Sequence, residues 1–389
     1  MKWHRVLSAF MPLLCGLLVS CGTSNQSASG NSSASVSSSQ VLYTINDGTV
    51  TTYAVDVSAL TFTPVEQPVN LITNGSLVQF VPAPNDDFLY VLWADAASQQ
   101  HLSVFATDSS GVPQTPAAQT VDAPSLYQFN ISRNAHFAYM MHVDSSGNQY
   151  VSTLRLFQIN PNNGKLHEYP QAQGTYGPYN IWPAALYGFS ADGSKIYLSQ
   201  QTSQGTFYEQ RPLNASNGTV GPGLVLYQLG NGPGTGSDTL VIGQQVMIDE
   251  HVAPGMAGYL DVFPLIPRPR HHLFRCTAAM LTTCATATNV QLSPRGKYLF
   301  LTDPPTQQIH VDRIHLTGMN VQDTGNSIPM TAQTPGFAFS PDGTLVYALL
   351  ASDSSLHVYW FNSSSGQLIG GSAPLPMGNS SGFAPASRP

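Results

Sequence analysis

The chain repeats one short phrase, and this repeat constrains the fold more than any other feature of the sequence. "FAFSPDGTLVY" begins at Phe337, "YGFSADGSKIY" at Tyr187 and "VQLSPRGKYLF" at Val290. In each copy, an alternating apolar segment leads to a polar turn with Gly and then to a second apolar segment. Alternation with a period of two predicts a strand with one buried face, and an Asp followed by Gly favours a tight turn. Each copy is therefore predicted to be a β-hairpin.

Weaker copies of the phrase occur in the same frame. "FVPAPNDDFLY" begins at Phe80 and "FNISRNAHFAY" at Phe129, so the successive starts of the five copies are 49, 58, 103 and 47 residues apart. The longest gap is about twice the others, which predicts one degraded copy inside it. We expect that copy to start near residue 249, with "GYLDVF" (258–263) as its second strand. The segment "GLVLYQLGNGPGTG" (223–236) is interpreted as an insertion before it.

A second phrase follows the hairpins and adds two more strands to each unit. It is clearest in "LHVYWFNSSSGQL" (356–368), with counterparts at 151–166 and 207–220. Each counterpart has an apolar strand, a polar turn that contains Gly, and the start of another strand. Units of about 45 to 50 residues with four antiparallel strands are typical of propeller blades.

The two ends of the repeating region complement each other. Residues 41–62 read as the later part of a unit with no first strand before them, and "GFA" in the tail repeats the "GFA" of residues 336–338. Phe383 in that tail lies 46 residues after Phe337. We therefore expect the tail to supply the missing first strand, which closes the sheets into a ring without exposed edges. With the degraded copy included, the expected number of blades is seven.

The phrase "FSPDG…VY", followed by an aromatic strand and a Gly turn, resembles the YVTN-type, lactonase-like seven-bladed propellers. This resemblance implies an all-β seven-bladed β-propeller with four-stranded antiparallel blades over residues 41–389. It also implies that a catalytic site, if there is one, lies at a mouth of the central channel and uses His, Glu and Arg. WD40 propellers share the architecture, but their Gly-His and Trp-Asp signatures are not evident in this sequence. A β-sandwich is the structural alternative, and the orphan closing strand argues against it.

The N-terminal residues predict export from the cytoplasm. Residues 1–20 combine a basic start with an apolar run, as in a signal peptide, and "LVSC" resembles the lipobox of bacterial lipoproteins. That resemblance implies a lipid on Cys21, whereas the alternative is an ordinary signal peptide with a chance Cys. The Ser-rich residues 21–40 are predicted to form a flexible tether. The domain is thus expected outside the cytoplasm, anchored to a bacterial membrane, at the outer membrane or periplasmic face if the cell is Gram-negative.

The composition excludes some functions. Only 9% of the residues are charged and the net charge is −7, which argues against nucleic acid as a partner. The sequence contains no Gly-rich phosphate loop, nucleophile elbow or HExxH motif. No cofactor is therefore expected.

Two cysteines lie within the predicted domain. Cys276 and Cys284 flank what the repeat frame assigns as a turn between the outer strands of the fifth blade. In an oxidising compartment, a disulfide across that hairpin is the favoured interpretation. The alternative is a metal site, but the spacing of these cysteines matches no standard zinc motif, and no metal is expected.

A few polar residues depart from the repeat and are the candidates for chemistry. They are His142 after the second strand of the third blade, Glu209 and Arg211 in "FYEQRPL", and Arg275 beside Cys276. Opening or closing a lactone needs a general acid or base and a cation that holds negative charge. The alternative is that all four are solvated residues at the ends of strands.

Two functions follow from these observations. The first is a membrane-anchored binding module whose loops contact a protein, an envelope polymer or a small molecule. The alternative is a lactonase-like hydrolase or cyclase with its site at the channel mouth. The sequence leaves open whether the protein is an enzyme.

Overall fold

The structure is a computed structural model of the whole chain. It describes residues 40–387 except 47, 133, 147–148, 170–172, 180–183, 191, 203–204, 230–238, 243–245, 252–258, 265–273, 288, 295, 319, 330–335, 351–353, 372–373 and 378–381. The predicted signal peptide and Cys21, together with nearly all of the tether, lie outside the described residues.

The described strands form seven antiparallel sheets, four of them with four strands and three with an additional short strand. The first sheet contains β1 (Gln40–Asn46), β2 (Thr49–Asp56), β3 (Thr61–Pro64), β4 (Val69–Asn70) and β31 (Gly382–Ser387). The second contains β5 (Gly75–Pro82), β6 (Phe88–Asp95), β7 (Gln100–Ala106) and β8 (Gln119–Asp122). The third contains β9 (Leu126–Ile131), β10 (Phe137–Ser146), β11 (Gln149–Ile159), β12 (Leu166–Glu168) and β13 (Gly174–Tyr179).

The remaining four sheets continue along the chain. The fourth contains β14 (Ala185–Phe189), β15 (Lys195–Thr202), β16 (Gly205–Pro212) and β17 (Leu224–Leu229). The fifth contains β18 (Thr239–Ile242), β19 (Val246–His251), β20 (Tyr259–Pro264) and β21 (Phe274–Cys276), and a short helix, α2 (Thr283–Thr286), follows it. The sixth contains β22 (Asn289–Leu292), β23 (Tyr298–Asp303), β24 (Gln308–His315) and β25 (Asn320–Pro329). The seventh contains β26 (Phe337–Phe339), β27 (Leu345–Leu350), β28 (Ser355–Asn362), β29 (Gln367–Ile369) and β30 (Leu375–Pro376).

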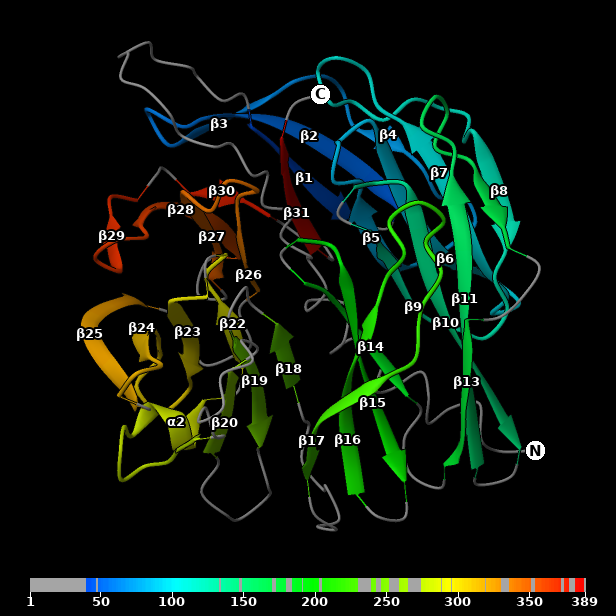
Figure 1. The fold of residues 1–389 in the computed structure, drawn as a ribbon. Coiled ribbons are helices and arrows are strands. Elements are labelled where there is room, and N and C mark those ends of the chain that lie inside the picture. Colours follow the sequence, from blue (N-terminus) through cyan, green and yellow to red (C-terminus); the bar gives the residue numbers. More distant parts are fainter. Residues whose placement is uncertain are drawn as a thin grey trace.

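The sheets follow one another around a ring in chain order, as Figure 1 shows. The chain is thus an all-β propeller with four-stranded antiparallel blades, as the repeat predicted. Apolar clusters fill the spaces between neighbouring sheets. One of them joins the sixth and seventh sheets and is rich in aromatic rings, with Phe300 packed edge-on against Phe339 at 4.8 Å between ring centroids. Burial of such side chains drives the sheets together, because each removes a large apolar area from water.

The predicted closure of the ring is confirmed by the pairing of the two ends of the domain. β31 lies antiparallel to β1, with Ala384 opposite Tyr43 and Phe383 opposite Thr44. The tail therefore supplies the innermost strand of the first sheet, and β31 also contacts β5 and β26 of the neighbouring sheets. The first described residue, Gln40, already pairs with β2 and β31.

Tyrosines on the second strands link consecutive sheets. Three of them donate a hydrogen bond from the hydroxyl to a Gly carbonyl in the turn between the third and fourth strands of the following sheet: Tyr43 to Gly111 (2.7 Å), Tyr90 to Gly164 (3.0 Å) and Tyr139 to Gly218 (2.8 Å). Tyr347 reaches from the seventh sheet back to the first, where its hydroxyl lies 3.2 Å from Oε1 of Gln40. The recurring tyrosine is thus a structural residue that joins neighbouring sheets.

The degraded unit differs from its prediction in two respects. Its first strand is β18 and its second is β19, so "GYLDVF" holds the third strand and the predicted start near residue 249 falls inside the second. The segment "LVLYQL" is not part of an insertion, since it forms β17 at the outer edge of the fourth sheet. The error arose because "VMIDEH" in β19 lacks the aromatic residue that marks the second strand of most other units.

No helix in the described part of the chain is long and apolar enough to cross a membrane.

Candidate functional site

Each sheet has two ends that carry different kinds of residue. One end holds the turns between strands one and two and between strands three and four, and we call it the repeat face. The other end holds the turns between strands two and three, and we call it the variable face. Because the Tyr-to-Gly hydrogen bonds join the same ends of successive sheets, these ends lie on common sides of the ring.

The repeat face is built from turn chemistry that recurs along the chain. In the fourth sheet, Oδ1 of Asp192 accepts hydrogen bonds from the hydroxyl of Ser190 and the backbone N–H of Ser194. Asp342 makes the same contacts with Ser340 and Thr344 in the seventh sheet. These aspartates hold turns, which accounts for their recurrence without a catalytic role.

His142 is the most unusual candidate on the variable side. It lies on the second strand of the third sheet, on the side of the 2–3 turn, and only 8% of its surface is exposed. Its Nδ1 lies 3.0 Å from the backbone carbonyl oxygen of Pro124, whereas Nε2 has no hydrogen-bond partner among the described residues. Burial lowers the pKa of this imidazole below its ordinary value, although the Pro124 carbonyl acts in the opposite direction.

Glu209 and Arg211 lie two residues apart on β16 and form a partly buried ion pair. Nη2 and Nε of Arg211 lie 3.0 and 3.1 Å from Oε2 of Glu209. Gln200 of the neighbouring strand donates a hydrogen bond to the other carboxylate oxygen, and the guanidinium lies over the ring of Tyr176 in the third sheet. Both candidates are thus engaged by protein groups.

Arg275 is also paired. Its Nε and Nη2 form a two-pronged contact with the carboxylate of Asp261 at 2.7 and 2.8 Å, and its guanidinium stacks over Tyr259 at 3.8 Å. Asp261 is fully buried, and such a carboxylate requires a partner of opposite charge. A structural role therefore explains the position of Arg275. Among the described contacts, Glu209 and Arg211 are the one pair of candidates that meet, whereas Arg275 pairs with Asp261 and His142 contacts the Pro124 carbonyl.

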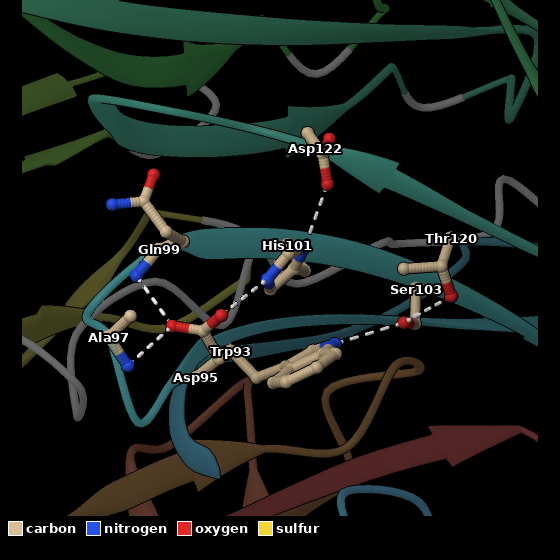
Figure 2. A network of polar contacts seen from close by, with 8 residues as sticks. All are labelled: Trp93, Asp95, Ala97, Gln99, His101, Ser103, Thr120 and Asp122. Atoms are coloured by element: carbon tan, nitrogen blue, oxygen red, sulfur yellow. Dashed lines mark hydrogen bonds and ion pairs between the residues drawn. The ribbon is translucent and has the colours of Figure 1, made fainter. Parts of the chain in front are cut away.

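A polar network on the second sheet was not predicted from the sequence (Figure 2). The ring of His101 lies between two carboxylates, with Nδ1 2.9 Å from Asp122 and Nε2 3.4 Å from Asp95. The N–H groups of Gln99 and Ala97 bind Asp95, and Gln99 is the main cause of a pKa below the usual range for this carboxyl. The indole of Trp93 packs against the imidazole of His101, with 4.6 Å between the ring centroids.

The sixth sheet carries a second pairing of His and Asp at the corresponding turn. Nε2 of His310 lies 3.6 Å from Oδ2 of Asp303, and the Thr306 hydroxyl donates a 2.6 Å hydrogen bond to the same oxygen. His101 and His310 on the variable face thus lie at places where the repeat frame has no consensus. The sequence signal was weak, because these residues are single departures from the repeat without a shared spacing.

The predicted disulfide is confirmed, but its location differs from the prediction. Cys276 and Cys284 are bonded, with a Cα–Cα distance of 5.7 Å. The bond does not cross a hairpin, since it ties β21 at the outer edge of the fifth sheet to α2, which leads to the sixth sheet. The described residues contain no group of three or more His, Cys, Asp or Glu side chains arranged to hold a metal ion.

Comparison with known proteins shows similarity at the level of the fold. No protein-family model matches the chain, and no curated protein matches it by sequence. Among solved structures, the periplasmic gluconolactonase of Pseudomonas aeruginosa has 15% identity and a TM-score of 0.59, over 90% of this chain and 99% of that one. A putative 6-phosphogluconolactonase of Bacteroides fragilis has 13% identity and a TM-score of 0.58, over 91% and 99% of the two chains. One from Bacteroides uniformis has 16% identity and a TM-score of 0.56, over 89% and 99%.

These similarities show a shared β-propeller fold. At such low identity they assign no activity and no catalytic residue to this chain, so the functional argument depends on the site itself.

Proposed function

We propose that the protein is a lactonase-like hydrolase and that His142 is its general base. The observation that carries the proposal is the hydrogen-bonding state of the His142 ring. A backbone carbonyl only accepts hydrogen bonds, so the 3.0 Å contact with Pro124 places the proton on Nδ1. Nε2 then holds a lone pair, and no described residue uses it.

The electrostatic environment supports the same role. Because burial lowers its pKa, the imidazole is neutral at neutral pH and its free nitrogen is able to accept a proton. In lactone hydrolysis, Nε2 would take a proton from water while the water oxygen attacks the lactone carbonyl. The ester C–O bond then breaks, and the alkoxide takes up the proton, which gives the open-chain hydroxy acid. The reaction requires no cofactor. Nε2 is covered in the free protein, so the substrate must displace the side chains above it.

The test is turnover of a panel of sugar and aliphatic lactones by the wild type and two matched variants. His142→Gln keeps a donor for the Pro124 carbonyl and loses the base. His136→Gln alters an exposed His on the repeat face, and serves as the control. We expect His142→Gln to lower kcat/KM at least about 100-fold and His136→Gln to leave it unchanged. The wild-type kcat/KM should rise with pH through a pKa below about 6.5. Equal activity of the three proteins, or no turnover of any lactone, would contradict the proposal.

A binding module is the second candidate, and the paired charges favour it. Glu209 pairs with Arg211 and Asp261 pairs with Arg275, as expected for rigid display rather than for catalysis. A protein, an envelope polymer or a small molecule remains the proposed type of partner. This function predicts saturable binding without turnover, with the affinity unchanged by His142→Gln.

We further propose that the protein acts outside the cytoplasm on a lipid anchor at Cys21, and that its seven sheets are the blades of one ring. The disulfide supports an oxidising compartment. Replacing Cys21 with Ser should move the protein from the membrane to the soluble fraction. Unchanged fractionation would rule out the anchor and leave the proposed activity untouched.

A further inference from the structure

The junction between the fifth and sixth sheets contains a buried acid beside a disulfide. α2 lies in this junction, where it contacts β20 and β23. Cys284 in α2 and Cys276 on β21 are almost fully buried, at 1% and 0% exposed. They belong to an apolar cluster that also takes residues from the sixth sheet, including Ile314 and Val321. The disulfide thus fixes α2 against an apolar interface between two sheets.

Asp312 on β24 faces this interface and is fully buried. Its Oδ2 accepts a 3.2 Å hydrogen bond from the hydroxyl of Thr283, the residue before Cys284, whereas Oδ1 has no hydrogen-bond partner among the described residues. A buried carboxylate with one weak donor is costly, so the carboxylic acid form is favoured. Burial raises the pKa of Asp312 to about 7, with Asp323 adding to the rise.

The charged groups around Asp312 give it no positive partner in the described residues. Asp323 lies directly opposite on β25 and repels it. Arg275 and Asp261, from the neighbouring β21 and β20, are engaged with each other. Arg313 follows Asp312 on the same strand but is exposed, and adjacent residues of a strand point to opposite sides. The residue of α2 that reaches the carboxyl is Thr283, which carries no charge.

We propose that α2 is a latch that the disulfide holds closed over the Asp312 carboxyl, so that reduction of the disulfide and ionisation of Asp312 loosen the same junction between two sheets. A dithiol would supply two electrons and two protons to the S–S bond, giving two thiols while the dithiol itself becomes a disulfide. Freed from β21, α2 would carry Thr283 away and expose Asp312 to water. This inference is independent of the proposed hydrolase.

The test is a thermodynamic cycle of equilibrium unfolding at pH 5 and pH 8. It compares the wild type, Asp312→Asn, Cys276→Ala/Cys284→Ala, and the combination of all three substitutions. The carboxyl is neutral in the native state at pH 5 and ionised at pH 8, whereas the unfolded chain is ionised at both. The raised native pKa therefore stabilises the fold at low pH, and that stability is lost as the pH rises through about 7. We expect the unfolding constant of the wild type, relative to Asp312→Asn, to rise between tenfold and about 100-fold from pH 5 to pH 8.

Without the disulfide, the unfolding constant relative to the matching Asp312→Asn variant should rise less than about threefold from pH 5 to pH 8, because Asp312 would already be hydrated. An equal rise with and without the disulfide would overturn the latch. An effect of Asp312→Asn on the unfolding constant that is the same at pH 5 and pH 8 would also overturn it. If Asp312→Asn does not fold, Asp323→Asn tests the same point. It removes the repulsion, so it should decrease the pH dependence of the wild-type fold only while the disulfide is intact.

Discussion

The two faces of the propeller differ in how much of their chemistry is repeated. On the repeat face, the tyrosine hydroxyls, the turn glycines and the turn aspartates occupy equivalent places in several sheets. On the variable face, His101, His142 and His310 each have different partners. Residues that recur stabilise the contacts between blades, whereas these three histidines have no task that the repeat imposes. The comparison therefore separates the fold from the function.

The largest effect should come from removing the closing strand. A chain that ends before Ser380 lacks β31, which leaves β1 without its inner neighbour and opens the edges next to β5 and β26. We expect a loss of several kcal/mol in the free energy of unfolding, with broad and less cooperative melting, because an exposed edge replaces a buried one. Calorimetry measures the loss, and a peptide of residues 380–389 should restore part of the melting temperature. An unchanged melting temperature would contradict closure by the tail.

A smaller loss should follow when a repeat-face glycine is replaced. Gly164 has a φ of +68°, and a Cβ there would lie 2.5 Å from Cδ1 of Phe88 in the preceding sheet. Gly325 is the matched control, because it has a φ of +72° and a Cβ added there would meet nothing within 4 Å. We expect Gly164→Ala to cost about 2–4 kcal/mol and Gly325→Ala only about 1 kcal/mol, as measured by denaturant unfolding. Equal losses of stability in the two variants would mean that the turn at Gly164 does not pack closely against Phe88 of the neighbouring sheet.

The tyrosine hydrogen bond should contribute less than the glycine contact. Tyr139→Phe removes the donor to the Gly218 carbonyl and keeps the ring packed against Phe189. Loss of one buried hydrogen bond should lower the free energy of unfolding by about 1–2 kcal/mol. His101→Gln on the variable face is the comparison, with a loss below about 1 kcal/mol because its contacts with Asp95 and Asp122 are partly exposed. If the variant of His101 proved the more harmful, the assignment of structure to the repeat face would be wrong.

The turn aspartate should give the smallest effect, and only in acid. The hydroxyl of Ser190, followed by the backbone N–H of Ser194, lowers the pKa of Asp192 to about 2. The native pKa is below the unfolded value of about 3.9, so this stabilisation is present above pH 4 and is lost as the pH falls toward 2. Relative to Asp192→Asn, the wild type should lose less than about 1 kcal/mol over that range, since the group is close to solvent. A difference that is independent of pH would refute the charge argument.

Most of the fold could be predicted from the sequence, because the turn motif repeats along the chain. Phe337 and Phe383 lie in equivalent first strands, because the register places Ala338 opposite Tyr347 and Ala384 opposite Tyr43. The sequence did not reveal that Tyr43 is equivalent to Tyr347, because the strands that pair around Tyr43, β31 and β1, are far apart in the chain. The start of the fifth unit was predicted at the wrong residue. Its second strand, β19, pairs with β18 and β20 as second strands do in the other sheets, but it lacks the aromatic residue by which the sequence marks such strands.

The candidate site was much less predictable. His142 stood out as a departure from the repeat, but its contact with Pro124 and its unused lone pair depend on how β10 packs beside the turn that precedes β9. The partner of Arg275 could not be predicted either, because cross-strand pairing brings Asp261 and Arg275 together from positions 14 residues apart. Composition and spacing carry no information on such pairing until the register is known.

The most direct test of a functional variable face is a hydrogen-exchange footprint with a bound, hydrolysis-resistant lactam analogue of a sugar lactone. Protection should concentrate in peptides that contain the second-strand ends and 2–3 turns, above all those with His142 and the Pro124 segment. Peptides with the turn glycines Gly111, Gly164 and Gly218 should exchange as in the free protein. Protection confined to these glycine turns, with the His142 peptide unchanged, would contradict the account.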